Sequence, residues 1–439
     1  MLPAAAALMF PALFILVFAG IPVAFSLLAT AFGFGLLAFG SKMGIQSLGV
    51  IEGVSTNYLF ASIPLFVFMG AVLERSGIAR RLFQATQYWV GWMPGGLAVA
   101  AILICTIFAA SAGVVGAVEV VVGIMAIPAM ARYGYDKKLI TGTICAGGSL
   151  GTMVPPSVIV IIYASVAQMS VGKLFAGIII PALLMVGCFI AYIVVQCILD
   201  PAKAPGLSRQ ELAVPLAEKL KVTATALLPG IVLIFLVLGT ILAGVASPTE
   251  AAAVGALGAI VLALLYRQLT VRLLIEALTV TVKLSTMIAF IIVGGTLFTS
   301  IFIVLGGGVL ISDGVHDLAL GQWGIIALFL FIVFLAGFVL DWTSIVLIVV
   351  PIFAPIIKSA GIDEFWFAVL VLITIQTAYL TPPMAPSIFY LKGVAPADYT
   401  YKLMYQGVIP FIVLQLLVLA IVALVPWTAS YLPTVMVGF

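Results

Sequence analysis

The sequence predicts an all-α polytopic membrane protein made of two inverted repeats, each with a re-entrant hairpin and a broken transmembrane helix. Three observations lead to this prediction. The composition is too apolar for a soluble domain, apolar runs of membrane-spanning length recur along the whole chain, and the two halves share a pattern of prolines and polar residues at a nearly constant offset.

The composition excludes several classes of protein. Of the 439 residues, 65% are hydrophobic and 8% are charged, and the mean hydropathy is +1.37. We therefore expect the chain to be surrounded by membrane lipid. The net charge of +3 is small and the basic residues are scattered over short loops, so no partner nucleic acid is expected.

Apolar runs define the expected membrane segments. Uninterrupted runs cover residues 4–19, 23–40, 50–73, 172–199, 222–243, 250–266, 276–311 and 403–430, and runs with a proline pair cover residues 139–168 and 364–391. Residues 88–131 and 319–357 differ, because small or polar residues interrupt them near the middle, as "AASAGVVGA" and "LDWTSI". Each is either a pair of full spans or one re-entrant hairpin whose tip stops at mid-membrane.

The distribution of Lys and Arg predicts the orientation of the chain, since cytoplasmic loops collect basic residues. Basic residues concentrate near residues 75–81, 132–138, 203–221, 267–272 and 392–402, and we expect all of these loops on the cytoplasmic side. Both termini then lie on the outer, periplasmic side. The polar segment 200–221 is expected to be a cytoplasmic linker between the halves, with an ordinary surface loop as the alternative.

A repeat relates the two halves, residues 1–199 and 222–439. The proline pair that begins at Pro155 in "GTMVPPSVIVIIYA" aligns with the pair that begins at Pro382 in "YLTPPMAPSIFYL", at an offset of 227 residues. An odd number of crossings separates equivalent segments, so the halves are inverted relative to each other. Inverted repeats are typical of transporters, where they place a substrate site at mid-membrane. A duplicated membrane protein with a structural role is the alternative.

The proline pairs and hairpin tips are the candidate sites. Two prolines in a spanning helix leave backbone carbonyls without partners, which is tolerated only beside protein, water or a ligand. Unwound carbonyls are suited to a cation, and the next helix N-terminus to an anion. Asp341 is the strongest single candidate, because an ionisable residue at membrane depth is by default functional. Glu119 is weaker, since it could serve an internal polar partner.

The segment "SPTEAAAVGA", which begins at Ser247, has a structural explanation. Ser247 is placed as the N-cap of a helix, Pro248 as its first residue and Glu250 as the partner in a capping box. We therefore assign this segment to helix capping and not to a binding site.

The segments "GGSLGTMVPPS", "YLTPPMAPS", "SPTEAAAVGA" and "ARYGYDKKLITG" together resemble the large membrane subunit of tripartite ATP-independent periplasmic (TRAP) transporters, over nearly the whole chain. The resemblance implies an elevator-type transporter of the bacterial inner membrane, in which hairpins and broken helices slide against a scaffold. It also implies Na⁺ as the coupling ion and no organic cofactor. The implied partners are a separate small four-helix membrane subunit and a periplasmic substrate-binding protein, which delivers an organic acid, either a carboxylate or a sulfonate.

The resemblance further implies two sodium sites. The first is expected at the first tip and first break, at Ser111, Gly151, Val154 and Pro155, and the second at Gly337, Asp341, Thr381 and Met384. Substrate-binding candidates are the small and hydroxyl residues around them: Gly113, Ser149, Thr152, Ser157, Thr343, Ser344 and Ser387.

Other functions are less well supported by the residues. An intramembrane enzyme is disfavoured because the sequence has no HExxH motif, no acidic metal-binding motif and no histidine within an expected span. A stand-alone carrier of organic anions, coupled to protons or sodium, is the alternative transporter. Proton coupling needs a titratable group in the moving part, and only Asp341 and Glu119 qualify, so sodium coupling through carbonyls and hydroxyls fits better.

Overall fold

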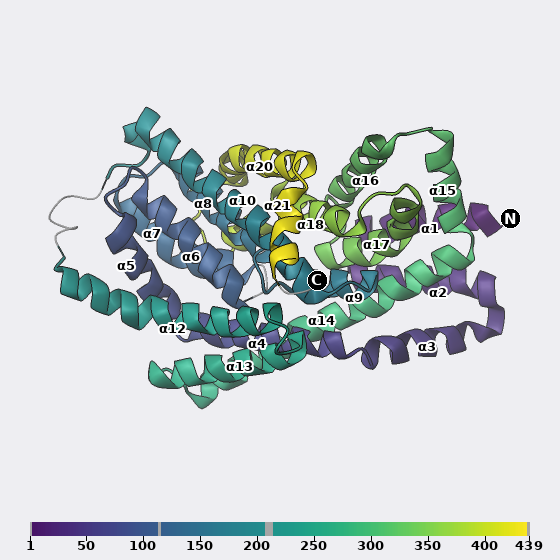
Figure 1. Cartoon of the computed structure of the whole chain (residues 1–439), viewed down its shortest axis with the longest axis horizontal. Helices are drawn as coiled ribbons and strands as arrows, with labels where there is room; N and C mark the ends of the chain where they lie inside the picture. The colour runs from purple at the N-terminus through teal and green to yellow at the C-terminus, as the bar shows by residue number, and fades with distance from the viewer. Residues whose placement is uncertain (1, 113–115, 207–213, 437–439) are drawn as a thin grey trace.

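The computed structural model describes residues 2–112, 116–206 and 214–436, and within these residues all regular secondary structure is helical (Figure 1). The predicted all-α class is confirmed. Within the described part, eight continuous helical stretches are long and apolar enough to cross a membrane: Val23–Ser55, Tyr58–Arg75, Val171–Leu199, Leu216–Leu242, Pro248–Leu265, Val271–Val304, Trp342–Ser359 and Tyr401–Leu424.

The helices fall into two series that follow each other along the chain. The first series is α1 (Leu2–Phe18), α2 (Val23–Phe39), η1 (Gly40–Lys42), α3 (Met43–Ser55), η2 (Tyr58–Ala61), α4 (Ser62–Arg75), α5 (Ile78–Val90), α6 (Gly96–Ala112), α7 (Ala117–Arg132), α8 (Lys137–Ser149), η3 (Leu150–Thr152), α9 (Val158–Ala167) and α10 (Val171–Leu199). The second is η4 (Pro201–Lys203), α12 (Leu216–Leu242), α13 (Pro248–Leu265), α14 (Val271–Val304), α15 (Gly307–Asp317), α16 (Gln322–Ala336), α17 (Trp342–Ser359), α18 (Glu364–Leu380), α19 (Pro386–Lys392), α20 (Tyr401–Leu424) and α21 (Trp427–Val435).

The offset of the sequence repeat reproduces the order of these helices. When the offset of 227 is added to the residue numbers of α2, α6, α8 and α10, the sums fall on α13, α16, α18 and α20, respectively. The proline pairs occupy the same place in both series, between α8 and α9 and between α18 and α19, and both have cis peptide bonds. Helix α12 begins at Leu216, so the helical part of the second half starts within the segment expected to be a linker.

Three expected spans are wrong in extent. The span expected at 50–73 is divided between α3 and α4, because the Asn57 side chain accepts a hydrogen bond from the Leu59 N–H and donates one to Ser165. Such bonds compete with a continuous helix. The span expected at 276–311 ends at Val304, before Gly306 with φ of 86°. The span expected at 403–430 ends at Leu424.

The segments 88–131 and 319–357 each fold back on themselves. The first consists of α6 and α7, with 17 and 16 residues, and α16 in the second has 15 residues. At 1.5 Å per residue these helices are about 23 to 26 Å long, less than the roughly 30 Å of a bilayer core. The lengths of α6, α7 and α16 therefore favour the re-entrant hairpin over a pair of full spans, whereas α17, with 18 residues, is one of the eight stretches that are long enough to cross.

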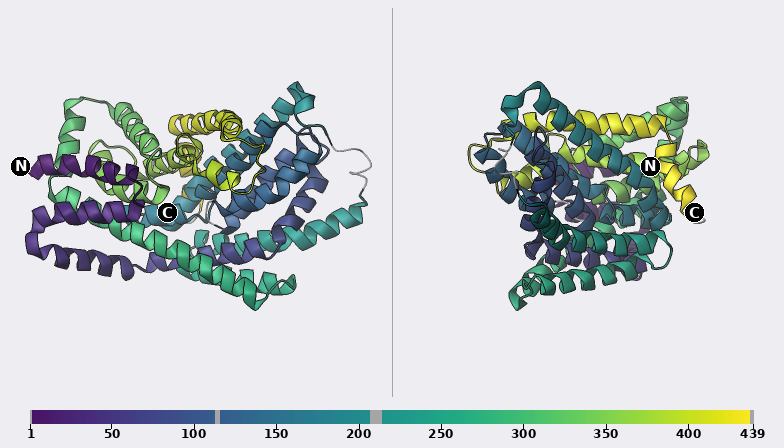
Figure 2. Two further views of the ribbon diagram at one scale, coloured as in Figure 1. Left: turned by 180° about the vertical axis from the view of Figure 1, so that it is seen from behind. Right: turned by 60° about the vertical axis from the view of Figure 1, so that its left-hand side comes forward.

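A layer of long helices supports the hairpins and broken helices (Figures 1 and 2). In this layer α2 packs along α14, and α13 packs along α4. Each of these pairs therefore joins a helix of the first half to a helix of the second half. The hairpins and broken helices contact one another across the halves in the same way, since α17 packs on α9 and α7 on α19. We call the first group, α2, α4, α13 and α14, the scaffold helices.

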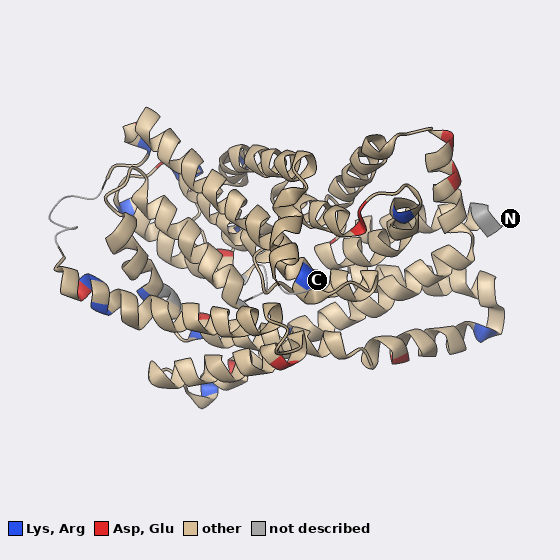
Figure 3. Cartoon of the chain, viewed as in Figure 1, with Lys and Arg blue, Asp and Glu red and all other residues tan. Residues whose placement is uncertain are grey.

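Charged residues lie mainly at helix ends and in loops (Figure 3). The capping box expected at the start of α13 is confirmed. The Ser247 N–H donates to Glu250 Oε2 over 2.7 Å, and the Glu250 N–H donates to Ser247 Oγ over 3.3 Å.

Candidate functional site

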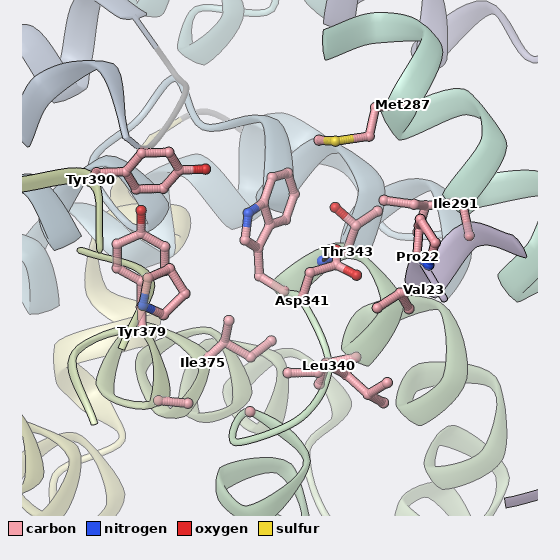
Figure 4. A pocket seen from close by; sticks show the side chains of 16 residues that line it. Pro22, Val23, Met287, Ile291, Leu340, Asp341, Thr343, Ile375, Tyr379 and Tyr390 are labelled. Atoms are coloured by element: carbon pink, nitrogen blue, oxygen red, sulfur yellow. Dashed lines mark hydrogen bonds between the residues drawn. The ribbon is translucent and has the colours of Figure 1, made fainter. Parts of the chain in front are cut away.

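A cavity of about 310 Å³ lies where the second tip and second break face the scaffold helices (Figure 4). One wall comes from the start of α2 and from α14, with Val23, Met287 and Ile291. The opposite wall comes from the second hairpin and from α18 and α19, and includes Asp341 and Tyr379. The cavity thus lies between the scaffold and the hairpin layer.

The second tip is organised by Asp341, which is the N-cap of α17. Its carboxylate accepts hydrogen bonds from the Thr343 N–H over 2.9 Å and the Ser344 N–H over 3.3 Å, and from Ser344 Oγ over 2.5 Å. Acidic N-caps of this kind satisfy N–H groups that the helix leaves free. The carboxylate is therefore held in place at membrane depth beside the cavity that it lines.

The second break begins where α18 ends at Leu380. Thr381 is extended, with φ of −86° and ψ of 130°, and its hydroxyl donates to the Thr377 carbonyl over 2.7 Å. Gly337 at the end of α16 lies against Ala378 so closely that a Cβ atom there would overlap the alanine methyl group. Glycine at this position therefore allows the tip and the break to meet.

The first break follows the same plan with tighter packing. Helix α8 ends at Ser149, the 3₁₀ turn η3 follows, and the Ser157 hydroxyl donates to the Thr152 carbonyl over 2.8 Å. The end of α6 packs on η3. Gly147 and Gly148 allow α6 and α7 to approach α8 closely, because a Cβ at Gly147 would overlap Cys105 in α6 and one at Gly148 would overlap the Glu119 side chain in α7.

The residues predicted for the first sodium site lie around this break. The Ser111 hydroxyl donates to the Ile107 carbonyl within α6, and Gly151 is buried in η3. Val154 and Pro155 line a second, apolar cavity of about 600 Å³ together with Thr106. The structure thus brings the break residues and the first tip to the same region.

The residues predicted for the second sodium site divide into two groups. Gly337 and Asp341 line the first cavity, whereas Thr381 and Met384 do not. Thr381 is half-buried just beyond the end of α18, and the Met384 side chain is 47% exposed.

Most of the substrate-binding candidates are buried away from the first cavity. Thr343 lines it, but Ser149, Thr152, Ser157, Ser344 and Ser387 do not. Their hydroxyl groups form hydrogen bonds within the protein, at Ala146, Ser149, Thr152, Asp341 and Glu119, respectively. Gly113 lies outside the described residues.

Sequence reasoning missed the two tyrosines of the cavity. Tyr379 lies in the last turn of α18 and Tyr390 in α19, and both rings line the cavity (Figure 4). Tyr390 also aligns with Tyr163 in the repeat, which marked it as an equivalent position but not as part of a site. Only the packing of α18 and α19 against the tip reveals their shared environment.

Glu119 is buried within the protein, and hydrogen bonds to its carboxylate compensate for its removal from water. Its side chain is 0% exposed, and its oxygens accept hydrogen bonds of 2.9 Å from the Gly116 N–H and from Ser387 Oγ. The carboxylate therefore connects the base of the first tip to α19.

Comparison with known proteins identifies the family that this chain resembles. Residues 10–428 match the family described as the DctM component of the tripartite ATP-independent periplasmic transporter. The C4-dicarboxylate TRAP transporter large permease protein DctM of Pseudomonas aeruginosa is 32% identical over 397 residues, with 90% of each chain covered. The sialic acid TRAP transporter large permease protein SiaM of Vibrio cholerae is 29% identical, with 97% of each chain covered.

Two solved transporter structures share the fold. The YdaH transporter of Alcanivorax borkumensis superposes with a TM-score of 0.67 at 16% identity, covering 97% of this chain and 98% of that one. MtrF of Neisseria gonorrhoeae superposes with a TM-score of 0.61 at 14% identity, covering 89% and 84%. At these identities the likeness concerns the fold alone.

Proposed function

This chain belongs to the family of DctM components of tripartite ATP-independent periplasmic transporters, and from that premise we propose that it is the translocation subunit of a sodium-driven importer of an organic acid. The observation that carries the proposal is the cavity between the second tip and break and the scaffold helices. A site with one wall on each group can change its access when one group slides past the other.

The proposed partners are a small membrane subunit and a periplasmic substrate-binding protein, in the bacterial inner membrane and with both termini of this chain on the periplasmic side. Support comes from the names of relatives, which include large permeases for C4-dicarboxylates and sialic acid and an isethionate permease called DctMQ. These relatives handle carboxylates and a sulfonate, so an organic acid is the substrate class we propose.

Sodium is the proposed coupling ion because both breaks offer oxygen atoms as possible ligands. The second set offers the Asp341 carboxylate, with Gly337 in the lining of the same cavity, and the extended backbone at Thr381. The first set offers the carbonyls around Gly151 and Val154. Hard cations prefer such oxygen ligands. Proton coupling is less well supported, since Asp341 already accepts the N–H groups of its own helix and Glu119 lies outside the described lining of the cavity.

Uptake into proteoliposomes tests this proposal. The vesicles contain this chain and its small subunit, and radiolabelled acids are presented with and without the binding protein and an inward sodium gradient. Uptake that requires both the binding protein and sodium is the expected result. Uptake driven by a pH gradient without the binding protein would instead identify a stand-alone proton-coupled carrier.

A further inference from the structure

Glu119 is a fully buried carboxylate that the proposed function leaves without a role. Its oxygens accept hydrogen bonds from the Gly116 N–H and from Ser387 Oγ, each over 2.9 Å. The Tyr379 hydroxyl is a third donor to the same carboxylate. None of the ion pairs in the described part of the chain includes Glu119, so neutral donors hold this charged group in place.

The contacts of Glu119 come from elements around both breaks. Gly148, in the last turn of α8 before the first break, lies so close that a Cβ there would overlap the carboxyl group. Ser387 Oγ also lies 3.0 Å from the Cys145 carbonyl oxygen in α8. Tyr379 is in the last turn of α18 and Ser387 in the first turn of α19, so these two donors lie on either side of the second break. The carboxylate therefore connects the two breaks to each other.

These contacts are close in sequence to residues predicted to bind sodium. At the first break, Gly148 is three residues before Gly151. At the second break, Tyr379 is two residues before Thr381. Over such short stretches of chain, a shift at a sodium ligand also moves the group that contacts Glu119, because the close-packed interior does not absorb the shift.

An aromatic contact provides a second connection between the halves. Gly116, with φ of 97°, lies at the base of the first tip, and a Cβ there would overlap the Tyr390 ring. Tyr390 also lines the cavity that Asp341 lines (Figure 4). The cavity beside the second tip is thus in contact, through one ring, with the backbone that donates to Glu119.

A purely structural role for Glu119 is the competing explanation. A buried carboxylate needs hydrogen bonds wherever it lies, and its donors satisfy that need. On this explanation, the loss of a donor lowers the amount of folded transporter and hence the maximal rate of uptake. It leaves unchanged the shape of the curve that relates uptake to sodium concentration, and this difference separates the two explanations.

We propose that Glu119 is a positioning residue that couples the two predicted sodium sites, so that sodium bound at one break raises the sodium affinity of the other. This inference rests on the proposed function and describes how its ion sites act together. Glu119 binds no ion itself and acts through Gly116, Tyr379 and Ser387. Coupling of this kind makes binding cooperative, with a Hill coefficient above one and at most about two for two sites.

The sodium dependence of uptake tests the coupling. The acid and the binding protein are kept saturating, and the Hill coefficient and the half-maximal sodium concentration are measured in the wild type, Ser387→Ala and Glu119→Gln. We expect a Hill coefficient above one in the wild type and about one in both variants. The half-maximal sodium concentration should rise about two- to twelvefold, the square root of a coupling factor of about 5 to 150.

Thr374→Ala is the matched control. Its hydroxyl is buried in α18, like that of Ser387 in α19, but it donates to the Leu370 carbonyl of its own helix over 2.9 Å. Removing this hydroxyl group should change neither the Hill coefficient nor the half-maximal sodium concentration, because it connects no other element.

Two results would overturn the proposal. One is a wild-type Hill coefficient of one, which leaves no coupling to explain. The other is a wild-type Hill coefficient retained in both variants, whatever their maximal rates. If Glu119→Gln does not fold, Ser387→Ala decides the question, because it keeps the carboxylate. Absence of sodium-dependent uptake in the wild type would refute the proposed function itself and is distinguishable from both results.

A second experiment measures sodium binding without transport, as thermal stabilisation of the purified complex with its small subunit. Asp341→Asn disables the second site, so the sodium dependence that remains reports the first. Adding Ser387→Ala should then cause no further rise in the sodium concentration for half-maximal stabilisation, because no second ion is left to couple. A further rise as large as that in the wild-type background would show a direct effect on the first site and contradict the coupling.

Discussion

The Ser387 hydroxyl in α19 donates a 2.9 Å hydrogen bond to Glu119 Oε1 in α7, across a sequence separation of 268 residues. The other oxygen of this carboxylate accepts the Gly116 N–H at the base of the first tip. One buried side chain therefore joins the first hairpin to the second broken helix. Because α19 also carries Tyr390, this connection reaches the wall of the cavity.

Glu119→Gln tests the importance of this connection. Glutamine has one acceptor oxygen in place of two, so either Gly116 or Ser387 faces an amide donor. We expect a loss of about 1 to 3 kcal/mol in the free energy of unfolding and slower uptake. Thermal unfolding in detergent measures the first effect. Glu250→Gln at the exposed capping box is the control and should cost less, and an equal cost in both variants would contradict the assignment.

Gly148→Ala tests the packing beneath Glu119. The added methyl group would overlap the Glu119 carboxyl group, which cannot move without losing its hydrogen bonds. We expect about 1 to 3 kcal/mol of destabilisation from this overpacking, measured by thermal unfolding. Gly187→Ala in α10 is the matched control, since nothing lies within 4 Å of its new Cβ. Removing that glycine should leave stability unchanged or raise it by about 0.5 to 1 kcal/mol. A tolerated Gly148→Ala would show that the carboxyl group is not fixed.

Asp341→Asn separates the charge of the second tip from its capping role. Asparagine is as good an N-cap as aspartate, so α17 should remain folded. We expect the sodium concentration for half-maximal uptake to rise at least about tenfold, because a carboxylate ligand has been replaced by a neutral amide. The control is Asp363→Asn, another N-cap, which accepts the Trp366 N–H over 2.9 Å at the start of α18. Equal sodium dependence in both variants would exclude Asp341 from the sodium site.

The ion pair between Lys137 and Asp398 predicts a pH dependence outside the membrane segments. Lys137 Nζ lies 2.6 Å from Asp398 Oδ2, joining the first turn of α8 to the loop before α20. The hydrogen bond from Lys137 lowers the pKa of Asp398, and the same bond raises the pKa of Lys137. The stabilisation is therefore present above the ordinary pKa of aspartate, about 4, and is lost as pH falls through the lowered value.

Asp398→Asn measures this contribution. The wild type should have a slightly higher melting temperature than the variant at pH 7, and the difference should vanish in acid and shrink at high salt, since both groups are exposed. On the alkaline side it should persist until pH rises through the raised pKa of Lys137. A difference that is constant from pH 7 down to pH 3 would show that the effect does not come from the ion pair.

The hairpins and breaks were predictable because their causes are local. Adjacent prolines remove donors from a helix wherever they occur, and Asp341 caps the helix that follows it through its own neighbours. The break at Asn57 was missed because one of its two hydrogen bonds goes to Ser165, far along the chain. A cavity beside the breaks was expected, but its scaffold-side lining from α2 and α14 was missed for the same reason, since the walls come from helices of both halves.

The substrate-binding candidates show that residue type alone does not reveal which hydroxyl groups are already hydrogen-bonded within the protein. Serine and threonine near the breaks were natural candidates for an anion, but the packed interior satisfies most of them internally. Ser149, for example, accepts a 3.1 Å hydrogen bond from the Gln415 side chain in α20. Which side chains line a cavity depends on how distant helices pack, so Tyr379 and Tyr390 emerged only from the three-dimensional arrangement.

Each pair of scaffold helices combines one helix from each half of the chain, so the scaffold can assemble only after the second half has been synthesised. Helix α2 packs along α14, but about 230 residues of chain are translated between Phe39 and Val271. At roughly 5 to 20 residues per second, α2 waits about 12 to 46 s in the lipid before its partner exists. We therefore expect a crosslink between Phe25 and Phe290, whose ring centroids are 6.1 Å apart, only in nascent chains extended well beyond Val304.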